Sequence, residues 1–217
     1  MQQIYQSGYM ALPSTRLNGV AAWQVGQLVH DHSQLPGAHR TPSAELGNDV
    51  LSHAKGKYGE LAFFDWLLEI GLTPDHTPFR GDYTKKVAED DFIVNGHRLE
   101  IKSKMRSDAS PFPPKATYNV NIGKQEIENA LHIFVEISGK RPLEEGPLAI
   151  ILGWATPALI RARGQRTWPG KVSANGRFTF KRHDWDLAIS DLLKPELLVD
   201  ELRAPRADRT NACTGFK

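Results

Sequence analysis

Charged and apolar side chains alternate on both sides of Asn95-Gly96, a dipeptide typical of two-residue β-hairpin turns. If this pair forms the turn, Asp91 lies opposite Glu100, and Cβ atoms of opposed residues are about 4.5–5.5 Å apart. Lys102 shares their face, because side chains alternate along a strand. Two facing carboxylates repel each other, and a divalent cation between them would remove the repulsion. The spacing therefore makes this hairpin a candidate site for Mg²⁺ or Mn²⁺, which prefer oxygen ligands.

The same hairpin has a simpler interpretation as an amphipathic pair of strands with one solvent-exposed face. The apolar face is the predicted core side and holds Phe92, Val94, Leu99 and Ile101. On the other face, basic residues would neutralise the acids without any metal: Arg98, Lys102 and Lys104. Asp90 is a rival ligand to Asp91, but this register places Asp90 on the apolar face.

A helix is predicted upstream of the hairpin, over residues 53–70, and Gly71 followed by Pro74 marks its end. Within it, Glu60 has apolar neighbours at helical spacing: Leu61, Phe63, Phe64 and Leu67. A carboxylate in such surroundings lies at the exposed margin of the helix or is buried with a partner, because an unpaired buried charge is too costly. The alternative is a surface ion pair with Lys55 or Lys57.

Glu60 on a helix, Asp91 on a strand and Glu100-Ile101-Lys102 on the next strand together resemble the PD-(D/E)XK nuclease superfamily. The stretch DFIVNGHRLEIKS is especially similar to its core motif, although Asp90 stands where the motif's name has proline. The resemblance implies an α/β protein with a restriction-endonuclease-like core, a mixed central sheet flanked by helices. In that fold a helix precedes a three-stranded antiparallel meander, and a second helix leads into a parallel strand. The corresponding segments here are helix 53–70, strands near 87–94, 97–104 and 117–122, helix 124–130 and strand 131–138.

The resemblance also implies a role for each site residue. Asp91 and Glu100 would ligate Mg²⁺, helped by the backbone carbonyl of Ile101, and Mn²⁺ would substitute. Lys102 would position or activate the attacking water, and Glu60 would act through water or hold a second ion. Gln125 and Lys124 match a further position that some members fill with Gln or Lys.

The implied reaction is hydrolysis of a DNA phosphodiester to leave a 5′-phosphate and a 3′-hydroxyl, and we expect an endonuclease. DNA contacts are expected from basic residues near the site: Lys104, Arg106, Lys115 and Lys124. A second basic cluster with Trp168 nearby is a candidate DNA-facing element, although a packed surface aromatic explains Trp168 equally well: Arg161, Arg163, Arg166 and Lys171. Two alternatives are a catalytically silent nucleic-acid-binding or assembly protein with the same fold, and an unrelated protein in which the motif arose by chance.

Composition limits the other possibilities. The 217 residues, 40% hydrophobic and 24% charged, fit one domain with a modest appendage. A single cysteine, Cys213, excludes a disulfide framework, thiolate zinc fingers and cysteine-ligated iron–sulfur clusters. The net charge of +2 gives no compositional sign of nucleic-acid binding. With no apolar run of membrane-spanning length and no visible signal peptide, we expect a cytoplasmic protein, and a homodimer would suit double-strand cleavage.

Three regions are predicted along the chain. Residues 1–50 form an extension of uncertain structure, residues 51–200 the nuclease-like domain and residues 201–217 a polar tail. Within the second region, 147–155 is a predicted strand, and Thr156-Pro157 is predicted to open a short helix. A strand is expected over 177–181 and a helix over 184–193.

Overall fold

The centre of the protein is a five-stranded mixed sheet with the order β1-β6-β5-β3-β2. The computed structural model describes residues 8–33, 50–75, 77–79, 91–106, 119–123, 130–139, 141–172, 179 and 183–205. In chain order the five strands are β1 (Met10–Ala11), β2 (Phe92–Val94), β3 (His97–Met105), β5 (Ala130–Ile137) and β6 (Ala149–Ala155). β3 and β5 are parallel, and the other neighbours are antiparallel. The expected α/β class with a mixed central sheet flanked by helices is confirmed.

A second, three-stranded antiparallel sheet lies beside the first. It consists of β4 (Asn119–Gly123), β8 (Asp184–Ala188) and β7 (Gln165–Arg166), with β8 in the middle. One apolar cluster, which includes Phe134, Ile160 and Leu187, joins β5 to α3 and β8. The central sheet is therefore covered on this side by the second sheet and by helix α3 (Pro157–Arg163).

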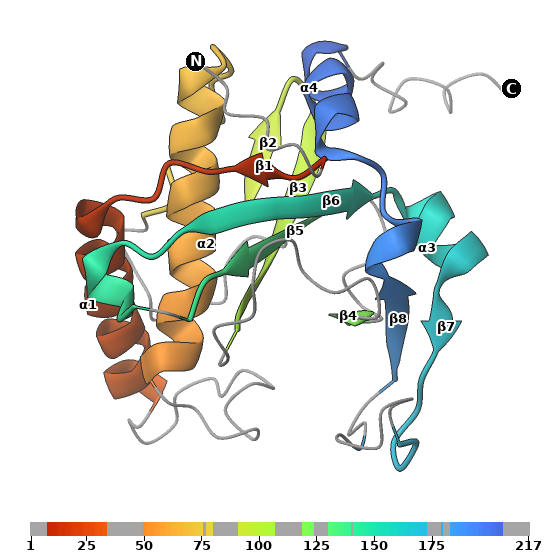
Figure 1. Ribbon diagram of the computed structural model, residues 1–217, viewed down its shortest axis with the longest axis horizontal. Coiled ribbons are helices and arrows are strands. Elements are labelled where there is room, and N and C mark those ends of the chain that lie inside the picture. Colours follow the sequence, from red (N-terminus) through yellow and green to blue (C-terminus); the bar gives the residue numbers. More distant parts are fainter. Residues whose placement is uncertain are drawn as a thin grey trace, which may run out of the picture.

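Two long helices, α1 (Arg16–Ser33) and α2 (Val50–Glu69), pack on the opposite side of the central sheet. Figure 1 shows them to the left of β5 and β6, with α3, β7 and β8 to the right. Helix α4 (Pro195–Arg203) packs near β6 and adds Leu198 and Leu202 to the main core. Two short 3₁₀ helices, η3 (Leu143–Glu145) and η4 (Ile189–Asp191), complete the described elements.

The β2–β3 hairpin forms in the predicted register. Asn95 and Gly96 have φ values of 48° and 80°, the left-handed conformation that a type I′ turn requires at both positions. The paired residues are Val94 with His97, Ile93 with Arg98, and Phe92 with Leu99. The predicted apolar face is buried, which fixes the direction of the charged side chains that follow: Phe92, Val94, Leu99 and Ile101.

The predicted end of α2 at Gly71 is confirmed. Gly71 has a φ of 77°, and its N–H and that of Leu72 donate to the carbonyls of Leu68 and Leu67. α2 also approaches β3 closely at Gly59, where a Cβ would lie 1.8 Å from the Ser103 hydroxyl oxygen. A residue without a side chain therefore sets how near this helix lies to the strand that carries the motif.

The expected three-stranded meander is wrong in its third strand. β4 overlaps the predicted strand 117–122, but it pairs with β8 in the second sheet and not with β3. Both edges of β3 are already occupied, one by β2 and the other by β5 in parallel. The predicted parallel strand 131–138 is confirmed as β5. Most of the predicted helix 124–130 lies outside the described residues.

The helix predicted over 184–193 is also wrong, because this segment forms β8 and then η4. Its backbone groups pair with strands on both sides, β4 and β7, and this pairing outweighs the helical spacing of its apolar residues. The cap at Thr156 is confirmed, since its hydroxyl accepts the Leu159 N–H at 3.1 Å. Of the strand predicted over 177–181, only Thr179 is described, in a bridge to Val172.

The N-terminal region, which the sequence leaves ambiguous, belongs to the same body. β1 pairs with β6, and residues 16–33 form helix α1, which packs against α2. No helix among the described residues has the length and apolar character needed to span a membrane.

Candidate active site at the start of the β2–β3 hairpin

Asp91 is the centre of the candidate site and lies directly before β2. Its carboxylate oxygen Oδ2 accepts the backbone N–H of Ile101 at 2.7 Å, and its own N–H donates to the Leu99 carbonyl at 3.0 Å. The paired strand residues end at Phe92 and Leu99, so Asp91 continues the contact with β3 through its side chain. The carboxylate is thereby held against the strand that carries Glu100 and Lys102.

The electrostatic surroundings of Asp91 bring the predicted residues together. Burial raises its pKa well above the ordinary value, and the charges of Glu60 and Glu100 raise it further. The Ile101 N–H and the Lys102 ammonium act in the opposite direction. Three elements therefore contribute to one electrostatic neighbourhood. Glu60 comes from α2, Asp91 from the residue before β2, and Glu100 and Lys102 from β3.

Both flanking carboxylates are engaged by lysines. Lys102 Nζ donates to Glu100 Oε1 at 2.5 Å. Lys57, one helical turn before Glu60, forms an ion pair with it, and Lys57 Nζ also donates to the Pro78 carbonyl at 2.8 Å. The sequence indicates Lys57 only as an alternative surface partner of Glu60, whereas its side chain is just 8% exposed.

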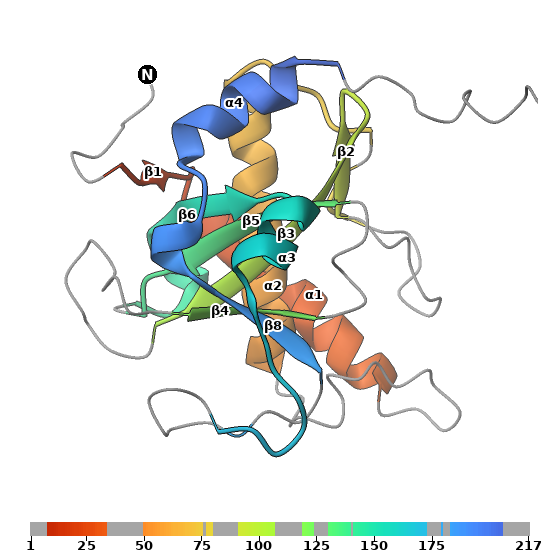
Figure 2. The same ribbon diagram turned by 90° about the vertical axis from the view of Figure 1, so that its right-hand side faces the viewer.

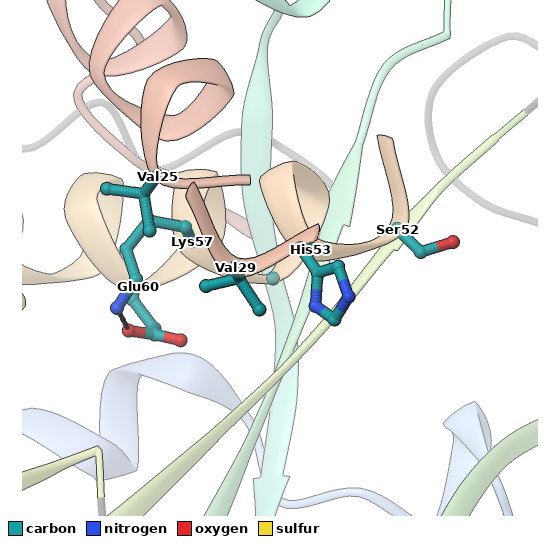
Figure 3. Close-up of a pocket in the computed structure, with 7 residues that line it drawn as sticks. Val25, Val29, Ser52, His53, Lys57 and Glu60 are labelled. Carbon is teal, nitrogen blue, oxygen red and sulfur yellow. Dashed lines mark hydrogen bonds and ion pairs between the residues drawn. The ribbon is translucent and has the colours of Figure 1, made fainter. Parts of the chain in front are cut away.

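The Lys57–Glu60 pair borders a cavity of about 270 Å³ between α1 and α2. Figure 3 shows the pair at one end of the lining and His53 with Ser52 at the other. The remaining lining is apolar or lacks a side chain: Val25, Val29 and Gly56. Glu60 therefore lies at the margin of α2 and is also paired with Lys57. It combines features of both positions that the sequence allows, the exposed margin and the buried site with a partner.

The donor chemistry suits a hard divalent cation, although the ligands are not gathered around one. Within the described ranges, no three His, Cys, Asp or Glu side chains are grouped so that they could hold a metal ion. Glu60 and Glu100 contact lysines instead. The carboxylates of Glu60 and Glu100 nevertheless repel that of Asp91, and a cation bound among them would relieve this repulsion. Binding would require Lys57 and Lys102 to release the carboxylates that they hold.

Two of the predicted DNA-binding residues are described. Lys104 is exposed, and partial desolvation lowers the pKa of its ammonium group. Arg106 instead donates through Nε to Glu136 at 2.7 Å, and the two side chains are 10% and 8% exposed. Arg106 thus ties the end of β3 to β5 in this structure. The other predicted residues of this region lie outside the described residues: Lys115, Lys124 and Gln125.

Comparison with known proteins adds no relative. No family model, no curated protein and no solved structure matches this chain. The resemblance therefore rests on the residues of the motif, on the helix–hairpin–parallel strand order, and on the charges of Glu60, Glu100 and Lys102 that act on Asp91.

Proposed function

We propose that this protein is a Mg²⁺-dependent DNA nuclease of the PD-(D/E)XK type, which leaves a 5′-phosphate and a 3′-hydroxyl and cuts as an endonuclease. One observation carries the proposal. Glu60, Glu100 and Lys102 are separated by up to 42 positions in the sequence, yet the charges of all three act on the carboxyl group of Asp91. Ordinary sheet stability does not call for three carboxylates in one neighbourhood, since like charges nearby are destabilising.

Asp91 and Glu100 would hold the Mg²⁺ ion, with the Ile101 carbonyl as a further ligand and Glu60 acting through water. The bound ion would polarise the phosphate and lower the pKa of the attacking water. Asp91 is already oriented by the Ile101 N–H. Lys102, once released from Glu100, would direct its ammonium group at the attacking water and at negative charge developing on the phosphate. Lys57 would hold the Glu60 carboxylate in position through their ion pair.

The test is cleavage of supercoiled plasmid and of linear DNA with Mg²⁺, Mn²⁺ or EDTA. We expect metal-dependent nicking of the plasmid by the wild type. Lys102→Ala and Glu100→Gln should each lower the cleavage rate by about 100-fold or more, the usual loss when one group that stabilises transition-state charge is removed. Lys194→Ala and Asp200→Asn are matched controls, because both residues are exposed and lie on or next to α4.

The outcomes separate the proposal from its alternatives. Metal-indifferent DNA binding without cleavage would identify a silent binding protein with this fold. Trimming from the ends of linear DNA, with intact supercoiled plasmid, would make it an exonuclease. If the wild type neither cuts nor binds DNA, or if the control variants lose as much activity as Lys102→Ala, the proposed site is wrong.

A further inference from the structure

Positive charge is concentrated in one stretch of the chain. Residues 147–183 contain seven Lys and Arg and no Asp or Glu, which leaves 20 basic against 25 acidic residues in the rest of the protein. The overall charge of +2 therefore conceals a basic segment in an otherwise acidic chain. Its described part includes α3 and β7, on the side of the central sheet away from α1 and α2, and Figure 2 views the molecule from this side.

The described arginines of the basic segment differ from the cations near the candidate active site in that no carboxylate of the described residues pairs with them. Near the candidate active site, each of three cations pairs with a carboxylate: Lys57 with Glu60, Lys102 with Glu100, and Arg106 with Glu136. By contrast, Arg161, Arg163 and Arg166 are exposed, and none of them forms an ion pair with a carboxylate of the described residues. Their charge is available to a polyanion.

Aromatic rings hold two of the cations in place without cancelling their charge. The Arg166 guanidinium lies 5.3 Å from the centroid of the Trp185 ring, and Lys171 Nζ lies 4.7 Å from that of Trp168. Lys171 Nζ also donates to the Arg166 carbonyl at 3.2 Å, which ties the two pairs together. Trp168 itself is 51% exposed, so much of its indole surface faces solvent.

The basic segment is electrostatically connected to the candidate active site. Asp186 on β8 interacts with Lys171 from one side and with Lys104 on β3 from the other. Lys104 is two residues beyond Lys102 and shares its face of the strand. Cations thus continue from the candidate site, past the two carboxylates of β8, Asp184 and Asp186, to the exposed tryptophan.

We propose that the surface formed by Arg161, Arg163, Arg166, Trp168 and Lys171 binds a single-stranded segment of nucleic acid and leads it toward Asp91. The four cations would contact phosphates, and Trp168 would stack on a base. An exposed aromatic beside unpaired cations is the combination that single strands use, because a duplex keeps the faces of its bases stacked inside. The inference rests on the proposed function for DNA as the ligand, and its test requires no cleavage.

The test is fluorescence anisotropy of a labelled single-stranded oligonucleotide of mixed sequence with the full chain in EDTA, repeated over a series of salt concentrations. We expect the triple variant Arg161→Ala, Arg163→Ala, Arg166→Ala to lower affinity and to reduce the salt dependence of log Kd by about 2, close to 0.7 per lost phosphate contact. The matched control removes three exposed cations elsewhere: Arg16→Ala, Arg141→Ala and Lys194→Ala. Its salt dependence should equal that of the wild type.

Trp168→Ala supplies the second, independent measurement. Loss of one base stack should weaken binding of the single strand about tenfold or more, while Trp168→Phe retains most of the affinity. The same substitution should leave binding of a blunt duplex nearly unchanged. Circular dichroism and melting temperature identify any variant that fails to fold.

Three results would overturn the inference. The first is that the Arg161, Arg163, Arg166 triple variant and the control triple variant lose equal affinity and equal salt dependence. The second is that Trp168→Ala binds the single strand as the wild type does. The third is that the duplex binds more tightly than the single strand and loses affinity by the same factor with Trp168→Ala. Binding that follows the expected pattern in a protein without cleavage activity would reject the nuclease and leave this surface assigned.

Discussion

Gly59 and Gly56 lie one turn apart on α2, and the same substitution should have opposite effects at the two positions. A helix interior favours alanine over glycine by about 1 kcal/mol, so Gly→Ala is expected to stabilise both when only the sequence is considered. At Gly56 nothing lies within 4 Å of an added Cβ. At Gly59 the added atom would lie 1.8 Å from Ser103 Oγ and 2.8 Å from Ser103 Cβ.

The size of the difference follows from these contacts. Rotating the Ser103 hydroxyl does not relieve the 2.8 Å contact between the two Cβ atoms, so α2 and β3 must move apart. Overpacking of this kind costs about 1–3 kcal/mol, and we take the upper end because the nearest atoms belong to the packed layer between a helix and a strand. After the gain of about 1 kcal/mol in helix propensity, Gly59→Ala should destabilise by about 2 kcal/mol. Gly56→Ala should stabilise by about 1 kcal/mol.

Urea unfolding of the two variants measures this difference directly. We expect a gap of about 3 kcal/mol, or about 6–12 °C in Tm for a protein of this size. Combining Gly59→Ala with Ser103→Gly removes the clash, so the double variant should be more stable than the sum of the two single changes predicts. Because Glu60 follows Gly59 directly, Gly59→Ala should also lower any metal-dependent cleavage, whereas Gly56→Ala should not.

Equal stability of the two alanine variants would refute the reasoning, since it would mean that α2 does not lie against β3 at Ser103. Additive effects in the double variant would refute it as well. The placement of Glu60 near Asp91 depends on the same helix position, so this result would also weaken the candidate site.

Three further predictions test separate parts of the structure. In EDTA, Asp91→Asn should raise the melting temperature at pH 8 but not at pH 4. Because the pKa of Asp91 is raised in the folded protein, its ionised form destabilises the fold above the folded-state pKa, and this cost disappears below the unfolded-state pKa near 4. An equal effect at both pH values would contradict the burial of Asp91 and its repulsion by Glu60 and Glu100. Tyr58→Phe should destabilise the protein by about 1–3 kcal/mol, because it removes the hydroxyl that donates to the buried Pro147 carbonyl. Burial raises the pKa of Tyr58 to about 12, so the stability of the wild type should fall more steeply between pH 10 and 12 than that of the variant. Arg106→Ala should cost up to about 3–5 kcal/mol in urea unfolding, because it removes the guanidinium that pairs with the buried Glu136 carboxylate; an unchanged stability with weakened DNA affinity would instead make Arg106 a DNA contact.

The hairpin and its motif could be predicted from the sequence because their determinants are local. Asn95-Gly96 selects the turn, the turn selects the register, and the alternation of side chains then assigns Phe92 and Leu99 to the core. The end of α2 at Gly71 follows in the same way from a single residue suited to positive φ. In each case a few neighbouring residues carry the whole signal.

The pairing of β4 and the conformation of 184–188 could not be predicted in this way. Both depend on which strand edges remain available once β3 has β2 and β5 as neighbours, and no local pattern records that. A five-residue segment with two buried side chains can form its backbone hydrogen bonds equally well within a helix or between two strands. Residues 184–188 form strand β8 because β4 and β7 lie on either side and pair with it.

In the candidate site, too, some features follow from the local sequence and others only from tertiary packing. The sequence by itself determined its residue types and the register that places Asp91 beside the strand of Glu100 and Lys102, because these residues lie within one hairpin. Only the tertiary structure decided that the charge of Glu60 acts on Asp91, that Lys57 is buried against Glu60, and that Arg106 pairs with Glu136. These contacts depend on how closely a helix packs on a sheet and on which strands are neighbours, and such distances are set by the whole core.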